Sequence, residues 1–168
     1  MKLKIDKNLY TLLLKYVRDD MKPLEFICIE NIDGVAYAIA ADGIKLIKYK
    51  LKDHIDDGCY MLMKSQNNYF LVYEEGVKYV NWRKVFPEYS KNSIIVNDFH
   101  KRKQSISFAE LITKISRSGK SFNCIDPKNF DTVPNNIGYK VSLEEDKVWT
   151  FENKDITILI NPVRCKKC

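Results

Sequence analysis

The side chains that could carry out chemistry are few and lie far apart in the sequence. The chain has five cysteines, at positions 28, 59, 124, 165 and 168, and two histidines. These residues offer no paired nucleophile and base of the kind that covalent catalysis requires. The sequence also lacks the G-x-S-x-G, H-E-x-x-H, P-loop and G-x-G-x-x-G patterns of common enzymes. We therefore predict no catalytic residues and a protein that is not an enzyme.

Two short clusters could be imagined as metal ligands. His54, Asp56 and Asp57 lie in a polar loop, but adjacent carboxylates in a turn are more often solvated than bound to a metal. Cys165 and Cys168 form C-K-K-C, which is one half of a zinc site and is otherwise a reduced, frayed tail. We predict neither a metal nor a cofactor. A four-thiolate site would need further ligands from Cys28, Cys59, Cys124 or a second chain.

Length and composition are those of an ordinary soluble protein. The 168 residues can form one domain or two small ones, and 45% of them are hydrophobic against 30% charged. The net charge of +6 permits a polyanionic partner without demanding one. No apolar run is long enough to span a membrane, and no signal peptide opens the chain. We therefore expect no membrane contact and a cytoplasmic location with reduced thiols.

The first third of the chain predicts one helix among strands. Asp6 can cap a helix, because the apolar residues that follow it recur at helical spacing. The apolar run 35–41 predicts a buried strand, and Asp42-Gly43 predicts a tight turn into a second strand with a basic face. Asp33-Gly34 predicts another hairpin turn. The expected order is a strand at 2–5, a helix that ends near Asp19-Asp20, and strands at 24–32, 35–41 and 44–51.

The remaining residues predict more strands and two further helices. Ser107 and Glu110 fit a capping box, followed by an apolar helical face that ends near Gly119. Pro127 stands at the first position of a second helix, as proline prefers. The fold class is therefore α+β. The expected strands are 59–63, 69–75, 93–99, 121–126, and three that alternate with turns over 137–164.

Three segments, which fall in order along the chain, resemble segments of one protein family. Residues 40–46, AADGIKL, resemble an A-T-D-G-H-R-L strand–turn–strand, and residues 86–92, FPEYSKN, resemble F-P-D-Y-R-R-V. Residues 159–165, LINPVRC, resemble an apolar strand that runs into M-P-M-R-L. The family is that of the bacterial sliding clamps, the DNA polymerase III beta subunits. Asn92 and Asn161 depart from it, since both place a polar group where the family has an apolar one.

The resemblance implies a sliding-clamp-like fold built from repeated βαβββ units, with two helices packed on antiparallel sheets. Those units would be residues 2–52 and 121–164, joined by an irregular, strand-rich middle at 53–120, in a single clamp-like domain over residues 1–168. A bacterial clamp subunit carries six such units, so this chain would be a shortened and divergent relative. The implied function is that of a DNA polymerase processivity factor or of a protein that binds replication peptides.

The resemblance also implies a peptide-binding groove, because the three segments surround one hydrophobic groove in the family. Its partners there are short peptide tails of polymerases, clamp loaders and repair proteins. If Leu46 is surface-exposed, Leu46→Asp is expected to abolish peptide binding and to leave the fold intact. The implied groove residues are Ala41, Gly43, Ile44, Lys45, Leu46, Pro87, Lys91, Leu159, Ile160, Pro162, Val163 and Arg164.

Double-stranded DNA, bound without regard to sequence, is the other implied partner. In one mode, copies of the chain assemble into a ring or partial ring around DNA, with helices that face phosphate. In the other mode, the protein keeps only the groove. A small basic nucleic-acid-binding module and a nucleic-acid-processing enzyme with an unrecognised site remain as alternatives. The expected DNA contacts are Lys7, Lys15, Arg18, Lys101, Arg102, Lys103, Lys114 and Arg117.

Overall fold

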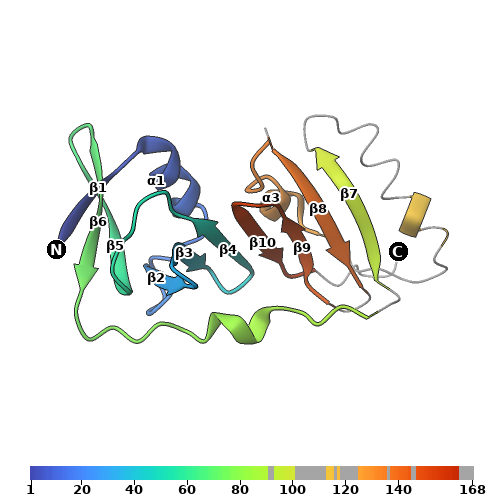
Figure 1. Cartoon of the computed structure of the whole chain (residues 1–168), viewed down its shortest axis with the longest axis horizontal. Coiled ribbons are helices and arrows are strands. Elements are labelled where there is room, and N and C mark those ends of the chain that lie inside the picture. Colours follow the sequence, from blue (N-terminus) through green and yellow to red (C-terminus); the bar gives the residue numbers. More distant parts are fainter. Residues whose placement is uncertain are drawn as a thin grey trace. The chain divides into compact units, whose positions relative to one another are not determined.

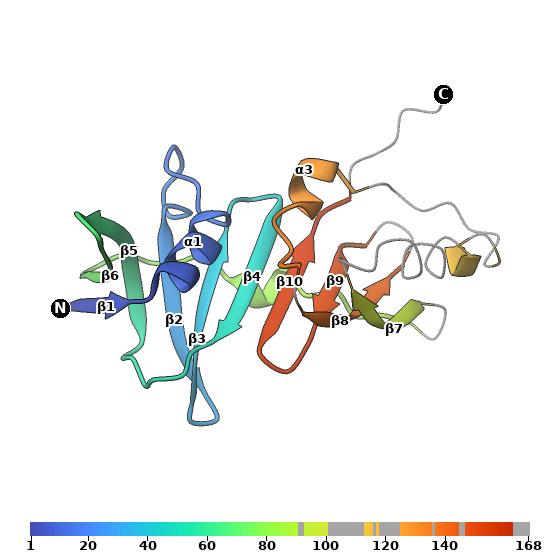
Figure 2. The same ribbon diagram turned by 90° about the horizontal axis from the view of Figure 1, so that it is seen from above.

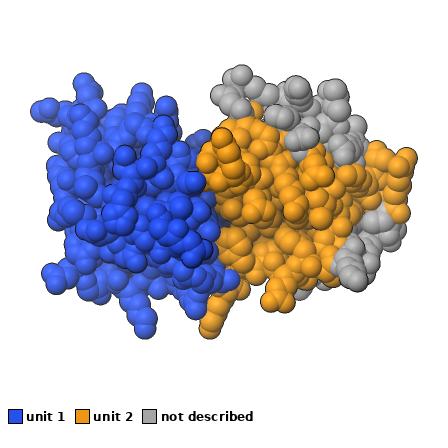
Figure 3. All heavy atoms as spheres, in the orientation of Figure 1, with its two compact units in different colours: residues 1–83 blue, residues 84–168 orange. Residues whose placement is uncertain are grey.

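The computed structural model describes residues 1–90, 93–100, 113–115, 117, 125–135, 137–144 and 147–162. The chain divides into two compact units, which Figure 3 shows in different colours. Unit 1 is Met1–Arg83 and unit 2 is Lys84–Cys168. In the described part of the chain, no helix is long and apolar enough to cross a membrane.

Unit 1 is an antiparallel sheet with one helix (Figure 1). The order of its strands is β1-β6-β5-β2-β3-β4. Strand β1 pairs with β6 and not with the strands that directly follow the helix. The elements are β1 (Lys2–Ile5), α1 (Lys7–Leu14), β2 (Phe26–Ile32), β3 (Val35–Ala41), β4 (Lys45–Lys50), β5 (Gly58–Ser65) and β6 (Asn68–Glu74), followed by the 3-10 helix η1 (Trp82–Val85).

The two predicted hairpin turns are present, and their conformations explain the residues that form them. Asp33 and Gly34 both have positive φ, of 51° and 78°, as a tight two-residue turn between twisted strands requires. Gly43 has a φ of 91° in the turn from β3 to β4. Asparagine, aspartate and glycine tolerate this region best. The Asp-Gly pairs therefore set the register of the central hairpins.

Helix α1 begins where the sequence predicts and ends earlier. The carboxylate of Asp6 accepts a hydrogen bond from the backbone N–H of Leu9 at 2.9 Å, which caps the first turn. The helix was expected to run to Asp19-Asp20, but it ends at Leu14. The N–H of Tyr16 donates to the carbonyl of Leu13, and the N–H of Arg18 donates to the carbonyl of Leu24. The last turn therefore closes through bonds between residues three apart, and Arg18 bonds to Leu24 instead of continuing the helix.

The two faces of the sheet in unit 1 are covered differently, because side chains alternate along a strand. One face holds the fully buried Ile29, Ala38 and Ile47, and α1 lies across it (Figure 2). On the other face, Trp82 contacts Glu30 of β2 and the ammonium of Lys48 of β4. We call residues 77–83, which lie over this second face, the strap. The strap separates part of β2 and β5 from solvent.

Unit 2 is a smaller antiparallel sheet of order β10-β9-β8-β7. Its core is aromatic, since Phe151 stacks edge-on or tilted against Phe99, Phe130 and Tyr139 at centroid distances of 5.9–6.3 Å. A short helix begins at Pro127, as predicted, and contributes Phe130. Its cap is Asp126, which was expected to end a strand. The described elements are β7 (Ile94–His100), α3 (Pro127–Phe130), β8 (Gly138–Leu143), β9 (Trp149–Glu152) and β10 (Ile156–Ile160).

The α+β class is confirmed by both units. Residues 2–50 follow the predicted order of strand, helix and three strands. The capping box at Ser107 and residues 121–124 of the expected strand 121–126 lie outside the described residues, and residues 125 and 126 are not in a strand.

Candidate functional site

The tip of the β3–β4 hairpin is built by the side chain of Asp42. Its Oδ1 accepts hydrogen bonds from the backbone N–H groups of Ile44 at 2.9 Å and Lys45 at 2.8 Å. Its other oxygen forms an ion pair with the ammonium of Lys45, whose side chain is only 10% exposed. Lys45 is one of the implied groove residues, but its charge is paired with that of Asp42. The exposed tip is therefore Gly43 and Ile44, of which Ile44 is 47% exposed.

The two strand residues that flank this tip are buried. Ala41 and Leu46 lie directly opposite each other in the register of β3 and β4. Leu46 is 4% exposed and Ala41 is also buried. Opposed residues of an antiparallel pair point to the same face, so both side chains pack inward together. Leu46 does not offer the open apolar floor that the groove expectation required.

The FPEY segment is held on unit 2 by its tyrosine. The hydroxyl of Tyr89 donates toward the carbonyls of Val148 at 2.8 Å and Ser142 at 3.0 Å, and lies 2.5 Å from the hydroxyl oxygen of Thr150. Burial raises the pKa of Tyr89 to about 12. The neighbouring Pro87 is half-buried. Tyr89 therefore fixes the position in which Pro87 is presented beside β8 and β9.

A second attachment of the same segment is the carboxylate of Glu144. It accepts hydrogen bonds from the N–H of Ser90 at 2.8 Å, the hydroxyl of Ser93 at 3.0 Å and the ammonium of Lys147 at 3.3 Å. The bond from the Ser90 backbone is the largest cause of a pKa lowered to about 2. Hydrogen bonds to the charged form favour ionisation. Glu144 therefore binds Ser90 and Ser93 most strongly while it is ionised.

Acid is expected to loosen unit 2 through this carboxylate. A carboxyl with a folded pKa below its unfolded value contributes stability above the unfolded value, about 4.5, and loses it as the pH falls toward 2. Glu144→Gln should lower stability at pH 7 and make it vary less between pH 4.5 and pH 2. Urea unfolding followed by Trp149 fluorescence in a Trp82→Phe background measures this, with Glu152→Gln, at an exposed position, as the control. If the free energy of unfolding falls equally with pH in wild type and in Glu144→Gln, the prediction is wrong.

The C-terminal strand places few of its predicted residues at the surface. Leu159 and Ile160 are buried at 2% and 0% exposure, whereas Pro162 is half-buried and Asn161 is exposed. The predicted groove residues Lys91, Val163 and Arg164 lie outside the described residues. Among the described residues, the expected groove therefore keeps the exposed Gly43 and Ile44 and the half-buried Pro87 and Pro162 at the surface. That the three segments converge stays a prediction.

The expected DNA contacts differ in how free their charges are. Lys7 of α1 and Lys15, which directly follows this helix, are exposed, and so is Arg117. The guanidinium of Arg18 is bound by Asp20 through contacts of 2.5 and 3.1 Å, and this pairing raises the pKa of Arg18 and lowers that of Asp20. The ammonium of Lys114 donates to the carbonyl of Ile95 at 2.8 Å. Lys101, Arg102 and Lys103 lie outside the described residues.

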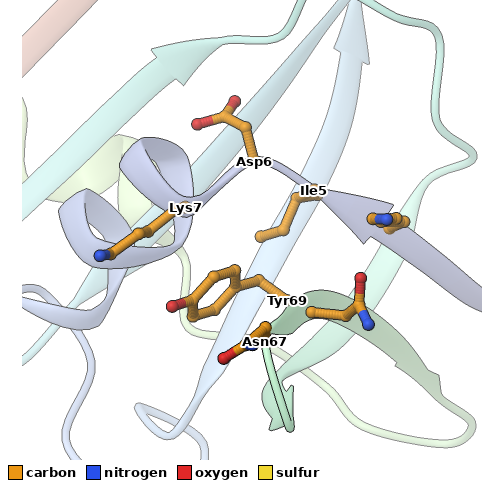
Figure 4. Close-up of a pocket in the computed structure, with 7 residues that line it drawn as sticks. Ile5, Asp6, Lys7, Asn67 and Tyr69 are labelled. Carbon is orange, nitrogen blue, oxygen red and sulfur yellow. The ribbon is translucent and has the colours of Figure 1, made fainter.

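A polar hollow of about 400 Å³ lies beside the first turn of α1 (Figure 4). Lys4, Lys7, Asn67 and Asn68 are among the residues that line it. The ring of Tyr69 packs against that of Tyr10 at 4.8 Å. In Figure 4, Lys7 and Tyr69 reach in the same direction. Ammonium and amide groups beside an aromatic ring can hold phosphate and a stacked base, as in sequence-independent nucleic-acid binding.

Sequence reasoning found only Lys7 of this hollow. Lys4 lies on β1, Asn67 lies in the β5–β6 turn, and Asn68 and Tyr69 begin β6. The pairing of Ile5 with Tyr69 brings these segments together. Only the pairing of β1 with β6 places these residues together, and no local sequence pattern predicts that pairing. Among the described residues, no group of three histidine, cysteine or acidic side chains could hold a metal ion. Asp57, one of the imagined ligands, instead accepts hydrogen bonds from Asn31 at 2.6 and 2.7 Å.

Comparison with solved structures shows that the fold is that of the bacterial sliding clamps. The chain is similar to the DNA polymerase sliding clamp of Pseudomonas aeruginosa with a TM-score of 0.61 at 11% identity, over 98% of this chain and 66% of that one. It is similar to the sliding clamp of Bacillus subtilis with a TM-score of 0.57 at 15% identity, over 99% and 65%. It is also similar to the Helicobacter pylori beta clamp bound to a DNA ligase peptide, with a TM-score of 0.58 at 11% identity, over 100% and 68%.

These likenesses span about two thirds of each clamp chain. The sequence matches no protein-family model and no curated protein sequence. The recognition made from the three short segments is confirmed at the level of fold.

Proposed function

We propose that this protein is a clamp-like replication protein that acts by binding and catalyses no reaction. The observation that carries the proposal is the likeness to bacterial sliding clamps over 98–100% of the chain, with TM-scores of 0.57–0.61. The described residues add a hairpin tip and a tyrosine-anchored FPEY segment, both of which suit a binding role. A cytoplasmic location follows from this function and is part of the proposal.

The proposed partner is a short peptide of a replication protein. The Helicobacter pylori clamp with the same fold is bound to a DNA ligase peptide. In this chain, the exposed Ile44 and the half-buried Pro87 and Pro162 are apolar groups that can bury an aliphatic or aromatic peptide side chain. Lys45 contributes its stem rather than its charge, since Asp42 holds the ammonium. The proposal requires that these groups come together around the peptide.

Titration calorimetry tests the peptide proposal. A peptide with a glutamine, an aliphatic residue and a terminal hydrophobic pair is expected to bind with a Kd of about 1 μM, which is about −8 kcal/mol. Ile44→Asp should weaken it about tenfold or more, because a charge replaces a contact on the apolar surface. Met61→Asp is the matched control, since Met61 is also an exposed apolar residue of unit 1, at 39%. Equal loss in both variants, or no binding by wild type, would refute the proposal.

DNA is a second proposed partner, favoured by the hollow of Figure 4 and the exposed cations on and beside α1. We propose that Lys7, Lys15 and Arg117, together with Lys4, contact phosphate without reading sequence. As a processivity factor the protein would assemble with further copies around DNA. Light scattering, with and without DNA, measures the mass of the particle in solution. A mass of several copies supports the assembly around DNA, and a mass of one copy supports a groove that acts in a single chain.

A further inference from the structure

Cys28 and Cys59 face each other on the neighbouring strands β2 and β5. The N–H of Leu51 donates to the carbonyl of Ala36, so even-numbered residues of β3 direct their backbone polar groups to β4. Ile39 therefore directs its backbone N–H and C=O groups to β2, where Cys28 is its partner. The backbone of Cys28 bonds to β3 and not to β5. Cys28 and Cys59 thus form a non-hydrogen-bonded pair, the kind in which opposed residues come closest.

Both thiols lie under the strap. The Cys59 thiol donates to the carbonyl of Val77 at 3.4 Å, and the Cys28 thiol lies 3.8 Å from a carboxylate oxygen of Glu30. Both side chains are buried, at 5% and 8% exposure. They line a hollow of about 480 Å³ whose other wall is the strap. The two sulfur atoms therefore share one side of the sheet and one small space.

We propose that Cys28 and Cys59 are an oxidisable dithiol that closes to a cross-strand disulfide when the protein meets a small-molecule disulfide. Opposed Cα atoms in a non-hydrogen-bonded pair lie about 4.5 Å apart, within the range of about 4.4–6.8 Å that disulfides span. Side chains of such a pair point to the same face of the sheet. The fold thus holds the two sulfur atoms where a bond between them needs little movement of the backbone.

The reaction is two thiol–disulfide exchanges with a compound such as oxidised glutathione. The thiolate of Cys59 attacks one sulfur of that disulfide, its S–S bond breaks, and one glutathione leaves as a thiolate that takes up a proton. The thiolate of Cys28 then attacks the Cys59 sulfur and releases the second glutathione. Two electrons pass from the two protein thiols to the oxidant, and the two protons of the thiols end on the two glutathiones.

The strap controls how fast this happens. Burial raises the pKa of both thiols, that of Cys28 to about 12, and the Glu30 carboxylate adds to the effect on Cys28. Cys59, whose shift is smaller, is therefore the first attacking sulfur. The strap is held down at Glu30, which accepts from the indole N–H of Trp82 at 2.8 Å and forms an ion pair with Arg83. An oxidant reaches Cys59 when these contacts open.

The test uses the full chain with Cys124, Cys165 and Cys168 replaced by serine, which leaves only the two cysteines in question. The protein is refolded in oxidised glutathione, and its thiols, intact mass and non-reduced peptide map are measured. Both thiols should vanish together, with the mass lowered by two hydrogens and the peptides of Cys28 and Cys59 joined. A natively folded product that keeps both thiols, or that ends with glutathione on either cysteine, would overturn the proposal.

Two variants in the same background test the order and the control by the strap. Cys28→Ser should stop at a mixed disulfide of Cys59 with glutathione. If Cys28 in Cys59→Ser forms its mixed disulfide faster than Cys59 does in Cys28→Ser, Cys59 is not the first attacking sulfur. Arg83→Ala should speed oxidation of the folded protein about tenfold, because a charge-assisted bond that closes the strap is lost. Lys84→Ala, at the exposed neighbouring position, should not. Equal rates in wild type and Arg83→Ala would show that the strap does not control access.

Discussion

Leu46→Asp is expected to unfold unit 1 rather than to leave a folded protein with a spoiled groove. Leu46 is 4% exposed and packs beside the buried Ala41. An aspartate there would bury an unpaired charge, at a cost of several kcal/mol, roughly 3–5. Domains of this size are stable by only about 5–15 kcal/mol, so most of the reserve of unit 1 would be lost.

The neighbouring Ile44→Asp is the matched control, because Ile44 is 47% exposed and should accept the charge within about 0.5 kcal/mol. Urea unfolding followed by Trp82 fluorescence in a Trp149→Phe background measures unit 1. If Leu46→Asp unfolds at the same urea concentration as the wild type, the side chain of residue 46 is open to solvent, as the floor of a groove would be.

Reversing three exposed cations, Lys7→Glu, Lys15→Glu and Arg117→Glu, is expected to remove DNA binding at physiological salt. The net charge falls from +6 to zero, and up to three phosphate contacts are lost. Each contact releases counterions, so the slope of log K against log salt should shrink by about 3. Lys114 and Arg18 are left unchanged, because Lys114 donates to the carbonyl of Ile95 and Arg18 is paired with Asp20.

The control for this prediction has the same net charge with α1 unchanged. Lys52→Glu, Lys78→Glu and Lys84→Glu also reverse three exposed lysines, none of which lies on α1. Fluorescence anisotropy with a duplex of arbitrary sequence, between about 50 and 200 mM salt, gives both slopes. If the two triple variants lose affinity equally, DNA responds to net charge alone and not to the proposed residues.

Local chemistry made the turns and strands of this chain predictable. Asp33-Gly34 and Asp42-Gly43 form turns because aspartate and glycine favour the backbone angles of tight turns. The positions of these turns indicate where the flanking strands end and begin. Asp126 and Pro127 begin a helix for a similarly local reason. Three short segments also led to the correct fold, since the positions that match include glycine and proline, whose roles are set by the backbone.

Tertiary contacts were not predictable in the same way. Nothing in residues 2–5 states that β1 pairs with β6, so the hollow beside Lys7 could not be foreseen. The ion pairs of Lys45 with Asp42 and of Arg18 with Asp20 were not predicted, although each forms through a turn of a few residues. Leu46 was taken as a lining residue from the family resemblance, and the hairpin sequence itself cannot state which face another segment covers.

The four-residue strand β1 has a consequence for how the protein behaves in concentrated solution. In unit 1 it is the last strand of the sheet order, and its lysines Lys2 and Lys4 alternate with half-buried apolar residues. Short edges that carry lysine resist pairing with the sheet of another molecule. Behind it lies β6, seven residues long and rich in aromatic and aliphatic side chains. Without β1, unit 1 would present an edge with the composition of an aggregation-prone segment, so this short strand protects the solubility of the chain.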